Sequence, residues 1–83
     1  MANPLTWISR AALGALLTEQ LRRVEGCHGA TISIGPSRDA EPGKSNWTEF
    51  FVTAPPDADE AYVRAVAGGV VSEVRERYNV LDA

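Results

Sequence analysis

The chain has 83 residues, 45% of them hydrophobic and 23% charged, and its acidic residues outnumber its basic ones to give a net charge of −3. This length and composition predict one globular domain, residues 1–83, rather than a disordered segment. The acidic balance disfavours nucleic acid as a partner, because phosphate binding needs concentrated Lys and Arg. No apolar run is long enough to span a membrane and no signal peptide is recognisable, so we expect a cytoplasmic protein.

The cysteine content limits how so small a domain can be stabilised. Cys27 is the only cysteine, so no internal disulfide can form. Its neighbour His28 and the scattered acidic residues lack the spacing of a metal site, and no cofactor is expected. A core of this size supplies about 3–5 kcal/mol of net stability. Self-association, most simply as a homodimer, is therefore the reinforcement that we expect.

A first amphipathic helix is predicted in the N-terminal third of the chain. Asn3 can cap it with Pro4 in the first turn, or Ser9 can cap a helix that begins later. Gly26 supplies the stop, because glycine tolerates the left-handed conformation past a helix end. The apolar stripe comprises Leu13, Leu16, Leu17, Leu21 and Val24.

Residues 30–35 and 47–53 are predicted to form the two strands of a hairpin. Apolar residues alternate with polar ones, which is typical of strands with one buried face. That face comprises Ile32, Ile34, Phe50 and Val52. The same alternation places Trp47 and Phe51 on the opposite, solvent-facing side. The polar connection Pro36–Asn46 is longer than a tight turn and is expected to extend from the hairpin tip.

A second amphipathic helix follows the segment Ala54-Pro55-Pro56. Asp57 as its N-cap and Glu60 three residues later have the spacing of a capping box. Its apolar stripe comprises Val63, Val66, Ala67, Val70, Val71, Val74 and Tyr78. Acid–base pairs at i,i+4 support both helices, namely Glu19–Arg23, Glu60–Arg64 and Glu73–Arg77. Small residues on the opposite side permit a close helix contact or mark a glycine kink; they are Ala61, Ala65, Gly68, Gly69 and Ser72.

These elements predict an α+β domain of order α-β-β-α, with the antiparallel hairpin packed against two helices. One chain does not account for the outer face and both edges of the hairpin. A four-stranded sheet made by two subunits, or a strand supplied by Pro4–Ile8, would complete it. That segment also suits a helix or an extended arm. The predicted core comprises Leu13, Leu17, Leu21, Val24, Ile32, Ile34, Phe50, Val52, Val63, Val66, Val70, Val74 and Tyr78.

No catalytic constellation is recognisable, and we do not expect an enzyme. Cys27 and His28 are neighbours in sequence, and the negative end of the preceding helix disfavours a thiolate. Gly43-Lys44-Ser45 matches only the end of a phosphate-binding loop, because Arg38 stands where the first glycine is required.

The leading hypothesis is a non-enzymatic interaction protein that works as a homodimer or docks on a partner protein, because surplus apolar surface marks a binding surface. The predicted interface comprises Trp7, Ile8, Trp47, Phe51, Ala61, Ala65, Gly68, Gly69 and Ser72. The alternative is a small-ligand or anion-binding module that uses the 36–46 loop and the outer aromatic face of the hairpin. Its predicted ligand residues are Arg38, Lys44, Trp47 and Phe51.

Overall fold

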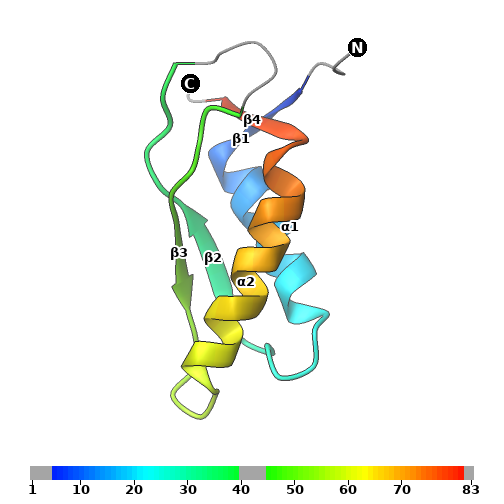
Figure 1. The fold of residues 1–83 in the computed structure, drawn as a ribbon, viewed down its shortest axis with the longest axis vertical. Helices are drawn as coiled ribbons and strands as arrows, with labels where there is room; N and C mark the ends of the chain where they lie inside the picture. The colour runs from blue at the N-terminus through cyan, green and yellow to red at the C-terminus, as the bar shows by residue number, and fades with distance from the viewer. Residues whose placement is uncertain (1–4, 40–44, 82–83) are drawn as a thin grey trace.

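The computed structural model describes residues 5–39 and 45–81 (Figure 1). Its elements in chain order are β1 (Thr6–Ser9), α1 (Arg10–Arg22), β2 (Thr31–Ile34), β3 (Phe50–Thr53), α2 (Glu60–Arg75) and β4 (Tyr78–Leu81). The α+β class, the hairpin and its two helices are as predicted. Two short strands are added, one before α1 and one after α2, and Figure 1 shows them together at one end of the molecule.

The strands form two separate two-stranded sheets. β2 and β3 are antiparallel, with Ile32 opposite Val52. β1 and β4 are parallel, with Thr6 opposite Tyr78. Pro4 lies outside the described residues, but the rest of the segment Pro4–Ile8 contributes to a strand, as one alternative predicted. That this strand completes the hairpin is wrong, because β1 pairs with β4 instead. β4 also begins at the residue that was expected to close the stripe of the second helix.

The starts of the helices follow their capping side chains. Ser9 accepts a hydrogen bond from the N–H of Ala12 at 3.1 Å, so α1 begins at the later of the two predicted positions. Asp59, rather than the predicted Asp57, caps α2 and accepts a hydrogen bond from the N–H of Tyr62 at 3.2 Å. The N–H of Ala58 donates to the carbonyl oxygen of Pro55 at 3.0 Å, which closes a turn before this cap. The cap therefore lies two residues later than predicted.

The three predicted ion pairs are present on the helix surfaces. All three are exposed and each contributes little to stability. Their nitrogen–oxygen distances are 2.8 Å for Glu19–Arg23, 2.7 Å for Glu60–Arg64 and 3.7 Å for Glu73–Arg77. α1 ends at Arg22, short of the predicted stop, and Gly26 lies in the following turn with a φ of 91°.

Both helices and both sheets bury side chains in one core. The predicted core residues are buried or packed half-buried against it. Four fully enclosed residues lie outside the predicted stripes and inner hairpin face: Cys27, Ala30, Trp47 and Val80. None of the described helices is both long enough and apolar enough to cross a membrane.

The burial of Trp47 overturns the expectation that this residue faces solvent beside Phe51. The Trp47 side chain is 0% exposed, whereas that of Phe51 is 60% exposed. Alternation places residues 47 and 51 on the same face of a strand only while the ladder of hydrogen bonds is unbroken.

The ladder is broken where the strands leave the hairpin. The N–H of Gly35 donates to the carbonyl oxygen of Glu49 at 2.8 Å, and the N–H of Arg38 donates to that of Asn46 at 2.8 Å. In a regular antiparallel ladder, the residues that bond to the partner strand are spaced by two. Because the interval here is three, the side chains beyond it that would have faced solvent face the core instead. Pro36, which has no N–H to donate, lies within the interval. The reversal turns the following tryptophan into the core.

Candidate interaction edge

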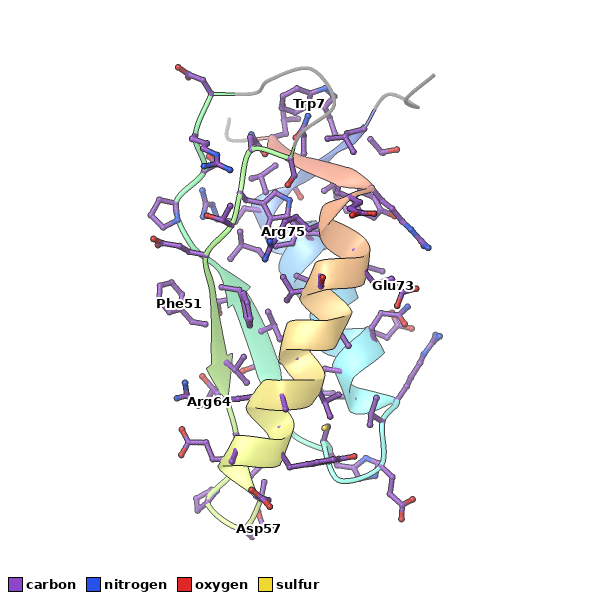
Figure 2. The ribbon with its side chains drawn as sticks, in the orientation of Figure 1. Trp7, Phe51, Asp57, Arg64, Glu73 and Arg75 are labelled. Carbon is purple, nitrogen blue, oxygen red and sulfur yellow. The ribbon has the colours of Figure 1, made fainter. Side chains whose placement is uncertain are left out.

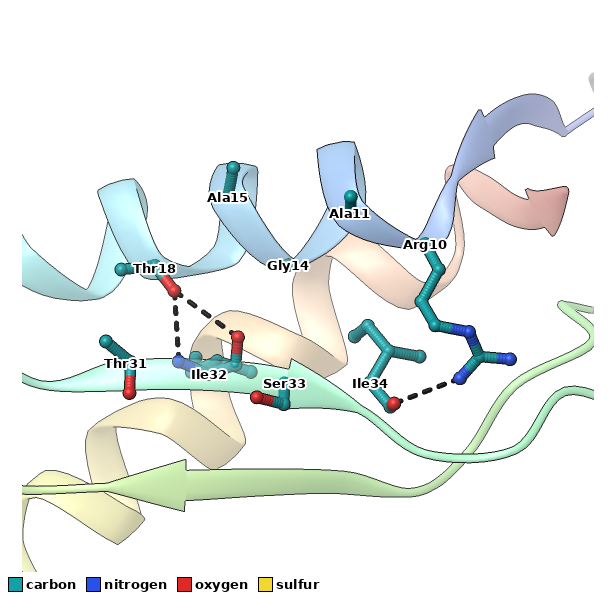
Figure 3. A pocket seen from close by; sticks show the side chains of 9 residues that line it. All are labelled: Arg10, Ala11, Gly14, Ala15, Thr18, Thr31, Ile32, Ser33 and Ile34. Atoms are coloured by element: carbon teal, nitrogen blue, oxygen red, sulfur yellow. Dashed lines mark hydrogen bonds between the residues drawn. The ribbon is translucent and has the colours of Figure 1, made fainter. Parts of the chain in front are cut away.

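Helix α1 seals the outer edge of β2 (Figure 3). The Thr18 hydroxyl accepts a hydrogen bond from the N–H of Ile32 at 3.0 Å and donates to the carbonyl oxygen of the same residue at 3.3 Å. Gly14, one turn earlier, permits the close approach of the helix, since a Cβ there would lie 3.4 Å from the Ile32 oxygen. One hydroxyl therefore takes the place of a neighbouring strand.

Two arginines extend this seal to both ends of β2. Arg22 Nε donates to the carbonyl oxygen of Ala30 at 2.9 Å, and Arg10 donates to that of Ile34 at 3.0 Å. Together with Thr18 they lie at multiples of four residues along α1, so they share one side of the helix. Each β2 carbonyl that points away from β3 is thereby bonded.

The outer edge of β4 is sealed by side chains from the segment before β3. The Asn46 amide accepts a hydrogen bond from the N–H of Val80 at 2.7 Å and donates to the Val80 oxygen at 3.0 Å, which is the pairing that a strand residue would make. The Trp47 indole N–H donates to the oxygen of Tyr78 at 3.0 Å. Both residues are buried. β4 thus has a partner on each side, β1 and this Asn46–Trp47 pair.

Arg75, near the end of α2, covers the same tryptophan. Its guanidinium carbon lies 5.9 Å from the centroid of the Trp47 ring, a distance typical of a cation–π contact. Its Nε is buried and has no hydrogen-bond partner among the described residues. Figure 2 shows this side chain reaching from α2 toward the hairpin side of the molecule.

The outer edge of β3, by contrast, is open. Because Gly35 and Glu49 bond to each other, the backbone groups of Phe50 and Val52 point away from β2. Within the described part of the chain, no hydrogen bond reaches them. β3 also contains no Lys or Pro, the residues that commonly protect an edge. The exposed side chain of Phe51 projects from its outer face (Figure 2).

β1 has a second edge that is open as far as the described residues show, but it is shorter. The N–H of Thr6 bonds to the oxygen of Arg77 at 2.9 Å, so the backbone groups of Trp7 point away from β4. The helix begins directly after this strand, at Arg10. The Trp7 side chain is 52% exposed and shares a face of the sheet with the exposed Leu81.

The predicted interface residues do not form one surface. Trp47 lies in the core, and Ile8 is half-buried against it. Phe51 belongs to one sheet and Trp7 to the other. The small residues of α2 face away from the core, and a Cβ added to either glycine would meet nothing within 4 Å. They are Ala61, Ala65, Gly68, Gly69 and Ser72.

The alternative ligand residues are not brought together as predicted. Trp47 points into the core and Phe51 points away from it, so the two aromatics cannot line one pocket. Lys44 lies outside the described residues. Arg38 does border a concavity of about 350 Å³, but the exposed aromatic beside it is Trp7.

The remaining candidates for chemistry are separated. The Cys27 thiol is fully buried, whereas His28 is exposed, so the pair does not form a nucleophile with its base. Across the described residues no three potential metal-ligating side chains converge.

Comparison with known proteins adds no relative. No protein-family model, no curated protein and no solved structure matches this chain.

Proposed function

We propose that this chain is a non-enzymatic interaction protein that associates with itself by adding a strand to the open edge of β3. The single observation that carries the proposal is the contrast between the edges of one hairpin. β2 is sealed by three side chains of α1, while the outward backbone groups of Phe50 and Val52 have no partner in the described structure. Unpaired strand edges bind other strands through their main chain.

The exposed side chain beside this edge supports the same function. Phe51 leaves most of its ring in water although it lies in the middle of the hairpin. Covering such a ring stabilises a complex through the apolar area removed from water. The compartment that we propose is the cytoplasm, where the lone Cys27 stays reduced.

Sedimentation velocity from low to high micromolar concentration tests this function. We expect the average mass to rise toward that of a dimer, and the variant Phe51→Lys to weaken the association about tenfold, because it replaces an apolar contact by two like charges. Ser33→Lys is the matched control, since Ser33 lies directly opposite Phe51 on the sealed strand and is also exposed.

Amide hydrogen exchange supplies a second measurement at single residues. In a monomer the amides of Phe50 and Val52 exchange fast, while those of their neighbours bonded to β2 are protected. Strand addition should protect the two outward amides as concentration rises. A constant monomer mass with unprotected outward amides at every concentration would contradict the proposed function. Protection by an added partner protein alone would make docking, rather than self-association, the use of this edge.

The second candidate function is ligand binding at the concavity beside Arg38. The observation that favours it is that the exposed Trp7 and Leu81 line the same concavity as Arg38. Quenching of Trp7 fluorescence by a small anionic aromatic compound, lost in Arg38→Ala, would support this use. Unchanged fluorescence in the presence of such compounds would count against it.

A further inference from the structure

The open edge of β3 is complementary to itself in one register. Resting on the proposed function, we propose that the partner strand is β3 of a second copy, paired antiparallel, with Phe51 of the two copies facing each other across a two-fold axis. The pairing makes a continuous sheet in the order β2-β3-β3-β2.

The backbone defines which registers are possible. The outward N–H and C=O groups of one β3 must lie opposite the outward N–H and C=O groups of the other. The two-fold axis therefore passes beside a residue and not beside a peptide bond. With the axis at Phe51, Phe50 exchanges both hydrogen bonds with Val52 of the second copy, and the symmetry repeats this pair. The outward N–H and C=O groups of Phe50 and Val52 are then bonded on both copies of β3.

The side chains select this register over its two neighbours, the first of which, with the axis at Phe50, would place Glu49 opposite Phe51 of the second copy. Phe51 occupies a non-hydrogen-bonded pair, where Cα atoms are about 4.5 Å apart and side chains are closest. Glu49 then lies opposite Thr53 of the second copy, so no like charges meet. Moving the axis to Val52 would instead place Glu49 opposite Pro55 and leave the two phenylalanine rings apart.

The seal on β2 explains why the occupant is a second copy and why assembly stops at two. A two-fold axis normal to the sheet places one β2 at each outer edge of the joined sheet, and both are bonded to their own α1 by Arg10, Thr18 and Arg22. On each outer β2 every outward carbonyl oxygen is then bonded, and the N–H of Ile34 is the one outward group without a partner in the described structure. A strand from an unrelated protein would carry its own free edge into the complex.

Disulfide trapping tests the register directly. All variants carry Cys27→Ala, so that the introduced thiol is the only one. Phe51→Cys places two thiols at a Cα separation suited to a disulfide. Ser33→Cys is the control at the same level on the same face, where the copies would lie about 14 Å apart, three strand spacings. We expect the Phe51→Cys dimer to form with an effective concentration at least about tenfold higher in a glutathione redox buffer.

A mixing experiment separates the register centred on Phe51 from the one centred on Val52. Glu49→Cys and Thr53→Cys should each fail to cross-link alone and should cross-link when mixed. Cross-linking of Phe51→Cys with Thr53→Cys in preference to itself would overturn the proposed register. Equal, slow oxidation of Phe51→Cys and Ser33→Cys, with sedimentation still showing a dimer, would overturn the edge pairing and leave self-association standing. A monomer at all concentrations would overturn both.

Discussion

The two edges of the hairpin show two ways of treating the same backbone groups. On β2, a threonine and two arginines of α1 bond to every carbonyl oxygen that points away from the ladder, and the threonine also bonds to the N–H of Ile32. On β3, the equivalent groups of Phe50 and Val52 have no partner in the described structure, and the residue between them is the exposed Phe51. β4 is sealed as β2 is, by Asn46 and Trp47. Side chains can therefore complete the hydrogen bonding of a short strand, and a strand edge without such side chains is a candidate binding surface.

The largest effect is expected where a seal is also part of the core. Trp47→Ala removes the largest fully buried side chain and leaves the oxygen of Tyr78 without its donor. We expect a loss of about 3–5 kcal/mol, most of the stability of so small a domain. Urea unfolding followed by circular dichroism measures it. Trp7→Ala, at an exposed position, is the control, and its free energy of unfolding is expected within about 0.5 kcal/mol of the parent. Equal losses in the two variants would contradict the placement of Trp47, and not Trp7, in the core.

Asn46→Ala should open the outer edge of β4 alone. It leaves the N–H and oxygen of Val80 unbonded in a buried position, which should cost about 2–3 kcal/mol. Amide exchange is the sharper measurement, because the Val80 amide should lose protection while the Asn79 amide, which faces β1, keeps more of it. Equal acceleration of both amides would show that the asparagine acts on the whole fold instead.

Thr18→Val tests the seal on β2 with a side chain of nearly the same shape. The valine can neither donate to Ile32 nor accept from it, so we expect a loss of about 1–2 kcal/mol in urea unfolding. Thr53→Val makes the same change on the exposed outer face of β3 and should be neutral within about 0.5 kcal/mol. A neutral result at both positions would remove the distinction between the edges.

The smallest effect concerns the bare outer face of α2. Gly69→Ala should stabilise the fold by about 0.5–1 kcal/mol, because the added methyl meets nothing and glycine weakens a helix. Gly26→Ala, at a φ of 91°, should have the opposite sign. Neither should change self-association. If Gly69→Ala weakens the dimer, the interface includes α2 and the β3 edge is not sufficient.

The sequence was informative wherever the pattern was local. The two helices, their apolar stripes and the inner face of the hairpin follow from spacings of three, four and two residues, and the structure has them. The ion pairs follow from i,i+4 spacing in the same way. Arg10, Gly14 and Thr18 also have helical spacing. Because they are polar or small and lie off the apolar stripe, their pattern is typical of a solvent-exposed helix face.

The rest depended on contacts between distant parts of the chain. β1 and β4 are four residues each, too short for a clear alternation, and they form only because the two ends of the chain meet. Trp47 turns inward because the alternation of hydrogen-bonded residues reverses between Gly35 and Arg38 while the pairing register is kept, which no propensity encodes. The open edge could be suspected but not located, since the sequence does not say which strand α1 would cover.

The parallel pairing of β1 with β4 also determines how the molecule responds to tension. The described chain enters this pair at Thr6 and leaves it at Leu81, and the register places these residues at opposite ends of the ladder. Pulling on the chain before β1 and after β4 therefore shears all the bonds of the ladder together instead of unzipping them singly. Asn46 adds a clamp on the far side of β4. A force transmitted along the chain meets this small sheet first, before it reaches either helix or the hairpin.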